Sequence, residues 1–376
     1  MKHNWEYKKI NDLGIIKSGY TPSSDDLATN GDFPYFKVAE MNLPGNEKYL
    51  IHSPSYLSGE IKTFPANSIV FPKNGAAVST NKKRILQVDS VVDLNTAVML
   101  ANQNISVNYL YYILINIDFA NLVKRGAVPT LNISELKNII VPVPPFETQV
   151  QIVAELDQIN DLIAKNRELL SQLDALAQSL FYNTFGDPIS NPKGFPTKTL
   201  KDVCVLKSGD SSANSLPDGD VPYVKVGDMN LIDNKRGIIT SSNFVNIGTK
   251  SKLLFPIGTT IFPKRGGAIL TNKKRLTKVQ ICCDLNIMGA IPQNIHPLYL
   301  YFFFLEKDFS ELVDGSTVPQ INNTDIYPLK IQVPPLALQE DFAANVEAIE
   351  AQEAKVEAEI AELQTLLDAR MDYWFN

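Results

Sequence analysis

The sequence contains few of the residues that most enzymes and metal proteins rely on. It has three histidines and three cysteines among 376 residues, and the histidines are scattered. Phosphate-binding loops of the type Gly-x-x-x-x-Gly-Lys-Ser/Thr, dinucleotide fingerprints, Cys-x-x-Cys pairs and His-Glu-x-x-His are all absent. The Asn-Pro-Pro-aromatic motif of amino-methyltransferases is absent too. We therefore expect no catalytic residues, no metal site and no cofactor bound by this chain itself.

Long apolar runs are also lacking. No run approaches the roughly 18 residues that a membrane-spanning helix needs. The first twenty residues contain no signal-peptide core, and three cysteines cannot form a disulfide framework. We expect a folded protein that resides in a reducing cytoplasm.

The chain is acidic overall, but the acidic residues are unevenly distributed. A net charge of -6 would by itself argue against a nucleic-acid partner. Basic residues outnumber acidic ones by 14 to 12 in residues 1–145 and by 17 to 13 in residues 186–335. Acidic residues prevail by 6 to 2 in 146–185 and by 10 to 2 in 336–376. The two long, mildly basic segments are therefore compatible with DNA binding.

The whole chain is an internal duplication with a period of about 190 residues. The segment FPKNGAAVSTNKKRIL (71–86) returns as FPKRGGAILTNKKRL (262–276), with ten of the first fifteen positions identical. The other matching segments are KSG at 17–19 and 207–209, PYFKVAEMN at 34–42 and PYVKVGDMN at 222–230, DLN at 93–95 and 284–286, GAVPTLN at 126–132 and GSTVPQIN at 315–322, and VPPFETQ at 143–149 and VPPLALQ at 333–339. The sequence predicts two copies of one structural unit.

Each half starts with short β-rich runs separated by glycine, proline and asparagine, which indicates an α/β domain of about 140 residues. Each half ends with Pro-Pro and a segment free of glycine and proline, which predicts a long helix. We therefore predict an α+β protein with tandem α/β domains at 1–145 and 186–335. The two helices are predicted at 146–185 and 336–376.

Mostly apolar residues recur at alternating spacings of four and three along both predicted helices, which is the a/d pattern of a coiled coil. Since the chain has two such helices, we expect them to pack on each other. Two polar residues interrupt the pattern, and they either fix the register of the helices or meet another subunit, the first being favoured. The predicted seam consists of Ile152, Leu156, Ile159, Ile163, Asn166, Leu170 and Leu173 in the first helix and Val346, Ile349, Glu353, Val356, Ile360, Leu363 and Leu367 in the second.

The repeated basic loop combines the residue types that bind DNA. Lysine and arginine neutralise phosphates, asparagine and arginine can also form paired bonds to base edges, and small residues let the backbone approach a ligand. The alternative is a solvated turn between strands, which the recurrence of Asn-Lys-Lys-Arg makes less favoured. Lys37 and Lys225 lie in apolar strands, either as exposed alternate positions or as DNA contacts. The predicted DNA-binding residues are Lys37, Lys73, Asn74, Asn81, Lys82, Lys83, Arg84 and Thr130 in the first half and Lys225, Lys264, Arg265, Asn272, Lys273, Lys274, Arg275 and Gln320 in the second.

The order of domain, Pro-Pro-x-x-x-Gln helix, domain and second Pro-Pro-x-x-x-Gln helix, with the join SLFYNTFGDPISNPKGF at 179–195, resembles the specificity subunits of type I restriction-modification systems. The resemblance covers essentially the whole chain. It implies that residues 1–145 and 186–335 are target recognition domains, each reading one half of a bipartite double-stranded DNA site through the major groove. It also implies that the helices pack antiparallel, with pseudo-twofold symmetry, and set the gap between the half-sites.

The resemblance further implies a non-catalytic subunit of a larger enzyme. Two methyltransferase subunits carrying S-adenosylmethionine would dock on the helices and domains, and two restriction subunits using ATP and Mg²⁺ can join. The acidic helices fit this expectation as surfaces for protein partners. The alternatives are a coiled-coil scaffold whose globular ends bind protein or glycan, and a DNA-binding regulator without a methyltransferase.

The similarity of the two halves leads to a first prediction. We expect the two half-sites to read almost as inverted repeats of each other, with Asn74 against Arg265 and Thr130 against Gln320 marking where they differ. Genome-wide mapping of methylated bases, with and without this protein, measures both half-sites. Two half-sites with no shared base pattern would contradict the expectation.

Overall fold

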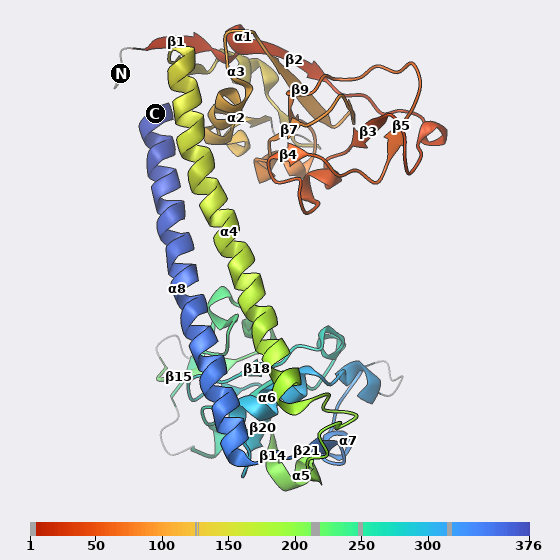
Figure 1. Ribbon diagram of the computed structural model, residues 1–376, viewed down its shortest axis with the longest axis vertical. Coiled ribbons are helices and arrows are strands. Elements are labelled where there is room, and N and C mark those ends of the chain that lie inside the picture. The colour runs from red at the N-terminus through yellow and green to blue at the C-terminus, as the bar shows by residue number, and fades with distance from the viewer. Residues whose placement is uncertain (1–4, 125, 127, 212–218, 247–250, 314–317) are drawn as a thin grey trace. The chain divides into compact units, whose positions relative to one another are not determined.

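The chain folds into two compact units, each mixing strands and helices (Figure 1). The computed structural model describes residues 5–124, 126, 128–211, 219–246, 251–313 and 318–376. Unit 1 comprises residues 1–167 and 358–376, and unit 2 comprises residues 168–357. Each unit therefore contains parts of two long helices, α4 (Phe146–Phe185) and α8 (Leu336–Phe375). The predicted class, two tandem α/β domains with two long helices, is confirmed, whereas the predicted boundaries between domain and helix stay a prediction.

Unit 1 contains a five-stranded sheet, a three-stranded sheet and two two-stranded sheets. Its strands are β1 (Glu6–Lys9), β2 (Gly14–Ser18), β3 (Phe33–Phe36), β4 (Tyr49–Leu50), β5 (Tyr56–Leu57), β6 (Ile69–Pro72), β7 (Arg84–Leu86), β8 (Val91–Val92), β9 (Thr96–Ala101), β10 (Val123–Lys124), β11 (Thr130–Leu131) and β12 (Ile140–Val143). Its shorter helices are α1 (Ile10–Leu13), α2 (Val107–Asn116) and α3 (Ile133–Asn138). The five-stranded sheet has the order β2-β9-β6-β7-β4 and the three-stranded one β5-β3-β8. Two pairs are parallel, β4 with β7 and β3 with β8, and the other pairs in these sheets are antiparallel.

Unit 2 repeats this topology. Its strands are β13 (Thr197–Thr199), β14 (Cys204–Ser208), β15 (Val221–Val224), β16 (Phe244–Val245), β17 (Thr260–Pro263), β18 (Arg275–Leu276), β19 (Cys282–Cys283), β20 (Ile287–Pro292) and β21 (Lys330–Gln332). Its shorter helices are α5 (Leu200–Val203), α6 (Pro297–Leu305) and α7 (Asn323–Ile326). The sheet orders β14-β20-β17-β18 and β16-β15-β19 match those of unit 1 strand for strand, apart from the edge strand β4. The duplication seen in the sequence is thus a duplication of the fold.

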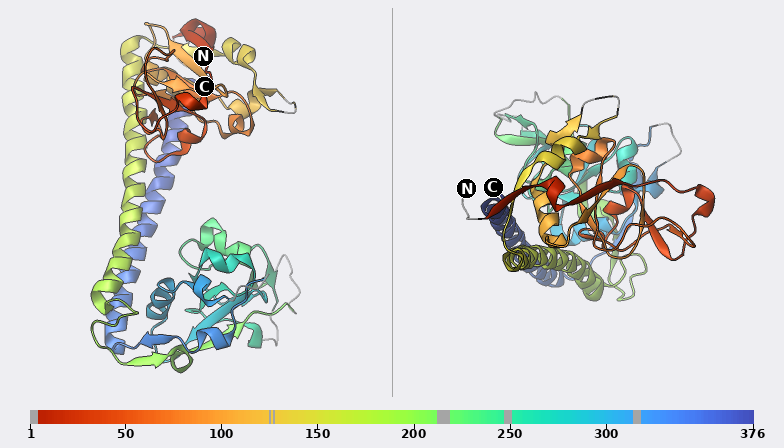
Figure 2. Two further views of the ribbon diagram at one scale, coloured as in Figure 1. Left: turned by 90° about the vertical axis from the view of Figure 1, so that its right-hand side faces the viewer. Right: turned by 90° about the horizontal axis from the view of Figure 1, so that it is seen from above.

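The long helices run antiparallel, since opposite ends of the two helices share a core. In unit 1, Ile152 near the start of α4 and Phe375 at the end of α8 belong to one apolar cluster with the aromatic residues of α2. In unit 2, Phe181 near the end of α4 and Phe342 near the start of α8 pack together with α6. Strand β1 also lies close to the end of α8 in unit 1 (Figure 2). The rings of Trp5 and Trp374 stack there.

Every residue predicted for the helix seam is buried or half-buried. Asn166 donates from Nδ2 to Oε2 of Glu359 on the facing helix at 3.3 Å, a contact that accords with a role in register. Glu353 makes a contact of another kind, and the two roles predicted for it stay predictions. It is 4 % exposed and pairs with Arg236, which belongs to the globular part of unit 2. Glu353 therefore ties the domain to the helix.

The repeated Pro-Pro-x-x-x-Gln motif joins each long helix to a shorter one. Gln149 is buried, accepts from the backbone N–H of Ser106 at 2.9 Å and donates to the Pro144 carbonyl at 2.9 Å. Gln339 makes the matching bonds with the backbone of His296 and Pro334. Each glutamine thus satisfies polar groups next to the start of α2 or α6 while fixing the start of α4 or α8.

The pair between half-buried Arg236 and buried Glu353 yields a second prediction. Arg236→Met leaves a buried carboxylate unpaired, so we expect it to lower the free energy of unfolding by about 3 kcal/mol. The matched control is Lys48→Met in the corresponding loop of unit 1, where Lys48 meets the more exposed Asp157. It should cost about 1 kcal/mol or less. Chemical denaturation measures both losses, and Glu353→Gln should restore part of the stability of Arg236→Met. Equal losses for the two single variants would contradict the prediction.

Candidate nucleic-acid interface

The repeated basic loop connects two neighbouring antiparallel strands in each unit, β6 to β7 in unit 1 and β17 to β18 in unit 2. Instead of a tight hairpin, each connection contains a single 3₁₀ helix, η3 (Ala76–Thr80) or η8 (Gly267–Thr271). The 3₁₀ helix ends at Asn81 or Asn272, whose φ values are 56° and 49°. Asparagine tolerates this left-handed conformation better than most residues, so both loops keep it where the chain turns back.

Backbone hydrogen bonds hold the loop between the Asp-Leu-Asn turn and the segment leading into β11. In unit 1 the N–H of Lys73 donates to the carbonyl of Asn95 at 2.8 Å, and that of Gly75 to Pro129 at 2.8 Å. The N–H of Leu131 returns a bond to the Lys73 carbonyl at 2.9 Å. The matching bonds of unit 2 run from Lys264 to Asn286 (2.8 Å), from Gly266 to Pro319 (2.8 Å) and from Ile321 to Lys264 (2.9 Å). The two loops are thus held in the same frame.

The repeated Lys-Ser-Gly segment supplies a side-chain contact to the same loop. Lys73 donates from Nζ to Ser18 Oγ at 2.7 Å, and Lys264 does the same to Ser208 at 2.8 Å. Partial burial lowers the pKa of both lysines. The following glycine is required by space, because a Cβ at Gly19 would lie 2.2 Å from the carbonyl oxygen of Asp93. The Lys-Ser-Gly and Asp-Leu-Asn repeats therefore belong to one arrangement.

The Met-Asn pair of the other repeated motif supports the loop from a second side. Lys82 donates from Nζ to Oδ1 of Asn42, and Arg84 donates from Nη2 to the carbonyl of Met41 at 2.9 Å. In unit 2, Lys273 donates to Oδ1 of Asn230. Arg84 also donates to the Lys83 carbonyl, as Arg275 does to that of Lys274. Both arginines are half-buried and engaged with backbone, so they hold the loop whatever they contribute to DNA binding.

Lys83 and Lys274 do not lie on the surface, which corrects their assignment as DNA contacts. Lys83 is fully buried, and its Nζ donates to the Ile117 carbonyl at 2.9 Å and to Oδ1 of Asn81, 3.8 Å from the centroid of the Phe119 ring. Lys274 is 1 % exposed and contacts Asn272 Oδ1, the Lys307 carbonyl and the Phe309 ring in the same way. Burial lowers the pKa of Lys83 to about 7 and that of Lys274 to about 8. An ammonium enclosed by such partners cannot reach a phosphate in this structure.

Lys37 and Lys225 are exposed, but neither lies in a strand as predicted. Strand β3 ends at Phe36 and β15 ends at Val224, one residue before each lysine. The strands end because the N–H of Lys37 donates to the buried carboxylate of Glu40 at 2.7 Å, which starts a 3₁₀ turn. The N–H of Lys225 donates to Asp228 in the same way at 2.8 Å. Their side chains remain accessible, and their contact with DNA stays a prediction.

The structure brings two further predicted residues directly opposite the loop. Asn74 forms an isolated antiparallel β-bridge with Thr130, and Arg265 forms one with Gln320. Sequence reasoning did not select the residues that frame the loop through a side chain or a backbone carbonyl, although each belongs to a repeated segment. They are Ser18, Asn42 and Asn95 in unit 1 and Ser208, Asn230 and Asn286 in unit 2. Their recurrence at matching positions was the signal available for finding them.

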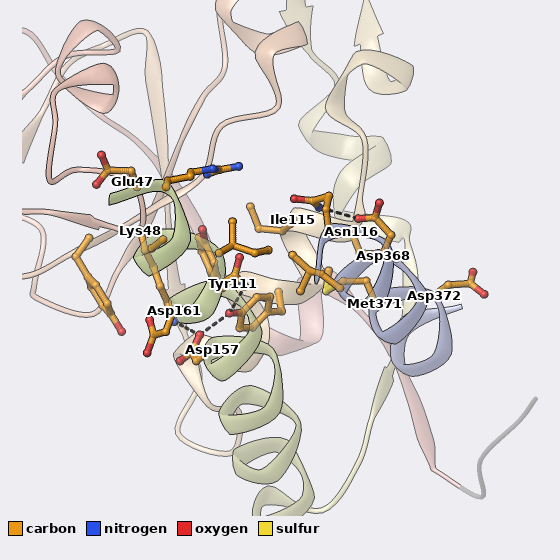
Figure 3. A pocket seen from close by; sticks show the side chains of 18 of the residues that line it. Glu47, Lys48, Tyr111, Ile115, Asn116, Asp157, Asp161, Asp368, Met371 and Asp372 are labelled. Atoms are coloured by element: carbon orange, nitrogen blue, oxygen red, sulfur yellow. Dashed lines mark hydrogen bonds and ion pairs between the residues drawn. The ribbon is translucent and has the colours of Figure 1, made fainter. Parts of the chain in front are cut away.

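Unit 1 also has a pocket of about 880 Å³ lined by α4, the end of α8, α2 and the residues around Lys48 (Figure 3). The charged residues around it are Glu47, Asp157, Asp161, Asp368 and Asp372 on the acidic side and Lys48 and Arg167 on the basic side. Figure 3 shows Lys48 paired with Asp157. The excess of negative charge makes this pocket unsuited to the phosphates of DNA.

The described part of the chain shows neither a metal site nor a membrane span. Within residues 5–124, 126, 128–211, 219–246, 251–313 and 318–376, no three histidine, cysteine, aspartate or glutamate side chains gather as metal ligands would. None of the helices in these ranges combines the length and the apolar character needed to cross a bilayer.

Comparison with known proteins identifies the class to which these repeated units belong. Residues 2–175 and residues 192–365 each match the model of the type I restriction modification DNA specificity domain. Since the two matches cover most of the chain, this protein has two such domains in tandem. It belongs to the family of type I restriction-modification specificity subunits.

Individual relatives agree with this assignment along most of their length. The specificity subunit of the type I restriction enzyme MjaIX from Methanocaldococcus jannaschii is 24% identical, over 97% of this chain and 91% of that protein. A putative type I specificity subunit of Haemophilus influenzae, S.HindORF215P, is 21% identical over 92% of this chain and 87% of its own.

Two solved structures share the fold. The type I restriction-modification S subunit from M. genitalium aligns over 99% of this chain and 96% of its own, with a TM-score of 0.59 and 16% identity. A chain from a study of complex assembly and conformational transition in the type I R-M system aligns over 98% and 96%, with a TM-score of 0.61 and 15% identity.

The different positions of Lys82 and Lys83 give a third prediction. Lys82→Ala removes a partly exposed charge, so we expect weaker DNA binding and a dependence of log K on log salt that is flatter by about one unit. Lys83→Met removes a buried charge and should lower the melting temperature without flattening that dependence. Binding titrations at several salt concentrations and thermal melts separate the two effects. Lys273→Ala and Lys274→Met repeat the comparison in unit 2. If binding is unchanged in all four variants, the DNA surface lies elsewhere.

Proposed function

We propose that each unit reads one half of a bipartite double-stranded DNA site through the surface around its basic loop. The support is the repeated frame. Lys73 and Lys264, on loops held by matching backbone bonds, make the same contact with a serine. Two equal surfaces of this kind suit a site made of two similar halves. On this proposal the helices α4 and α8 set the unspecific gap between the halves.

We further propose that the chain is non-catalytic and holds no cofactor of its own. S-adenosylmethionine would be carried by two methyltransferase subunits, and ATP with Mg²⁺ by two restriction subunits that can join them. The support is the absence of catalytic and nucleotide-binding motifs from the sequence, together with its membership of a family of specificity subunits. Chemistry on the DNA would then depend on those partners.

The helices are the proposed docking surface for the methyltransferase subunits. Acidic residues outnumber basic ones by 10 to 2 in residues 336–376, so this region repels DNA and suits contacts with protein. The acidic pocket of unit 1, which α4 and α8 line together, supports the same assignment. The observation that carries the whole proposal remains the duplicated loop frame.

Co-purification provides the fourth prediction. Expressed with its methyltransferase subunit, the chain should be recovered at one specificity subunit to two methyltransferase subunits, and the complex should methylate a two-part DNA site. A regulator would bind DNA without a methyltransferase, and a scaffold would bind neither.

Arg265→Ala serves as an internal control. Because Arg265 is exposed on the unit 2 loop, its replacement should alter recognition of one half-site only. Changes in both half-sites would contradict one-to-one reading by the two units.

A further inference from the structure

The two loops share their backbone, and one of the positions at which their side chains differ belongs to a cross-strand pair. The bonds from the loop to the Asp-Leu-Asn turn and to the segment before β11 have equal partners and nearly equal lengths in both units. Within this common frame, unit 1 places Asn74 opposite Thr130, and unit 2 places Arg265 opposite Gln320. Both members of the cross-strand pair have therefore changed together. The lysines that flank them are the same in the two units.

In unit 2 the pair is tied by side-chain hydrogen bonds. Arg265 donates from Nε to Gln320 Oε1 at 3.0 Å, and Gln320 donates from Nε2 to Asn322 Oδ1 at 2.6 Å. Arg265 is nevertheless exposed. Gln320 is its one side-chain acceptor among the residues that the structure describes, so the two terminal amino groups of the guanidinium remain for a ligand. A guanidinium held at Nε has fewer orientations to lose when it binds.

Unit 1 has no counterpart to this arrangement in its described residues. Asn74 donates to Oδ1 of Asn95 at 3.5 Å, which is at the limit of a hydrogen bond. Thr130 is too short to hold a side chain across the bridge as Gln320 does. The amide of Asn74 is therefore the group that this loop offers at the position of the Arg265 guanidinium.

The two groups differ in the base that they match. Two terminal amino donors fit the O6 and N7 acceptors of guanine in the major groove, whereas a carboxamide fits the N6 donor and N7 acceptor of adenine. Phosphate contacts carry no sequence information, and the lysines shared by both loops already supply them. The change from Asn74 to the exposed and oriented Arg265, in a frame whose lysines are unchanged, is therefore best explained by base reading.

We propose that the cross-strand pair is the unit that selects one base pair in each half-site. Arg265, oriented by Gln320, selects guanine, and Asn74, opposite Thr130, selects adenine. The proposal rests on the proposed DNA-reading function and adds to it the position and the identity of one base. Neither member of the pair is sufficient alone, because Arg265 depends on Gln320 for its orientation.

Exchange of the pair between the units tests this proposal. The full chain, with its methyltransferase subunit, carries N74R, T130Q or both, and methylated bases are then mapped across a genome that lacks other methylation. N74R/T130Q should replace adenine by guanine at one position of the unit 1 half-site, with a preference of about tenfold to a hundredfold for the new base. The reciprocal R265N/Q320T should make the opposite change in the other half-site.

The control is S79L, which exchanges another residue that differs between the loops, since Leu270 stands at the position of Ser79. It should leave the recognised sequence unchanged. An unchanged sequence in both exchanged pairs, or full conversion by N74R alone, would overturn the proposal. So would loss of methylation in both reciprocal pairs at unchanged melting temperature.

Failure of the proposed DNA-reading function can be distinguished from failure of the pair proposal. If the unaltered chain yields no two-part methylated sequence, the proposed function fails before the pair is tested. If it yields one and R265A weakens binding equally at all sequences, Arg265 contacts phosphate and only the pair proposal fails. A change of the recognised base with retained DNA binding supports both the DNA-reading function and the pair proposal.

Discussion

Each long helix is buried at both of its ends, and the rest of the structure depends on this constraint. The start of α4 and the end of α8 complete the core of unit 1, and the opposite ends complete the core of unit 2. Phe375, the penultimate residue of the chain, therefore stabilises the N-terminal domain, where its ring lies 5.4 Å from that of Tyr109. Neither domain has a complete core without helix residues from the other half of the sequence. The duplicated halves of the sequence are thus not the units that fold.

The residues that the two loops share are needed to build the loop at least as much as to contact DNA. Of the shared Asn-Lys-Lys-Arg, the asparagine adopts the left-handed turn, the second lysine is enclosed and the arginine binds backbone carbonyls. In unit 1 the first lysine and the arginine are both partly exposed and both donate to another repeated motif, Lys82 to Asn42 and Arg84 to Met41. A duplicated loop keeps the residues that build its frame, because loss of any one leaves buried polar groups unpaired. The buried apolar positions change only between similar residues, as from Val78 to Ile269, whereas the polar Asn74 becomes the exposed Arg265.

Local patterns in the sequence were sufficient to predict the helices and the duplication. A segment free of glycine and proline with regular apolar spacing has few alternatives to a helix, and α4 and α8 begin directly after their Pro-Pro pairs. The frame of the site was not predictable in this way, since Lys73 and Ser18 are 55 residues apart. In a sequence, a buried lysine looks like an exposed one. The difference at Lys83 is decided by the Ile117 carbonyl and the Phe119 ring, which the fold alone brings to it.

The duplication preserved the loops but changed how the domains are anchored to the helices. In unit 1 Lys48 pairs with Asp157, whereas in unit 2 the corresponding Arg236 pairs with Glu353 and Glu357, positions that are Ile163 and Arg167 on α4. Lys278 adds a further pair with Glu350. Arg236 and Lys278 together contact three of the ten acidic residues in 336–376 and offset two of their negative charges within unit 2. Part of the negative charge of α8 is thus offset by ion pairs with the globular part of unit 2. The surface of α8 is therefore less acidic than composition alone suggests. Among the residues that line the acidic pocket of unit 1, all of which the structure describes, Lys48 and Asp157 form the one ion pair, so this surface keeps most of its negative charge.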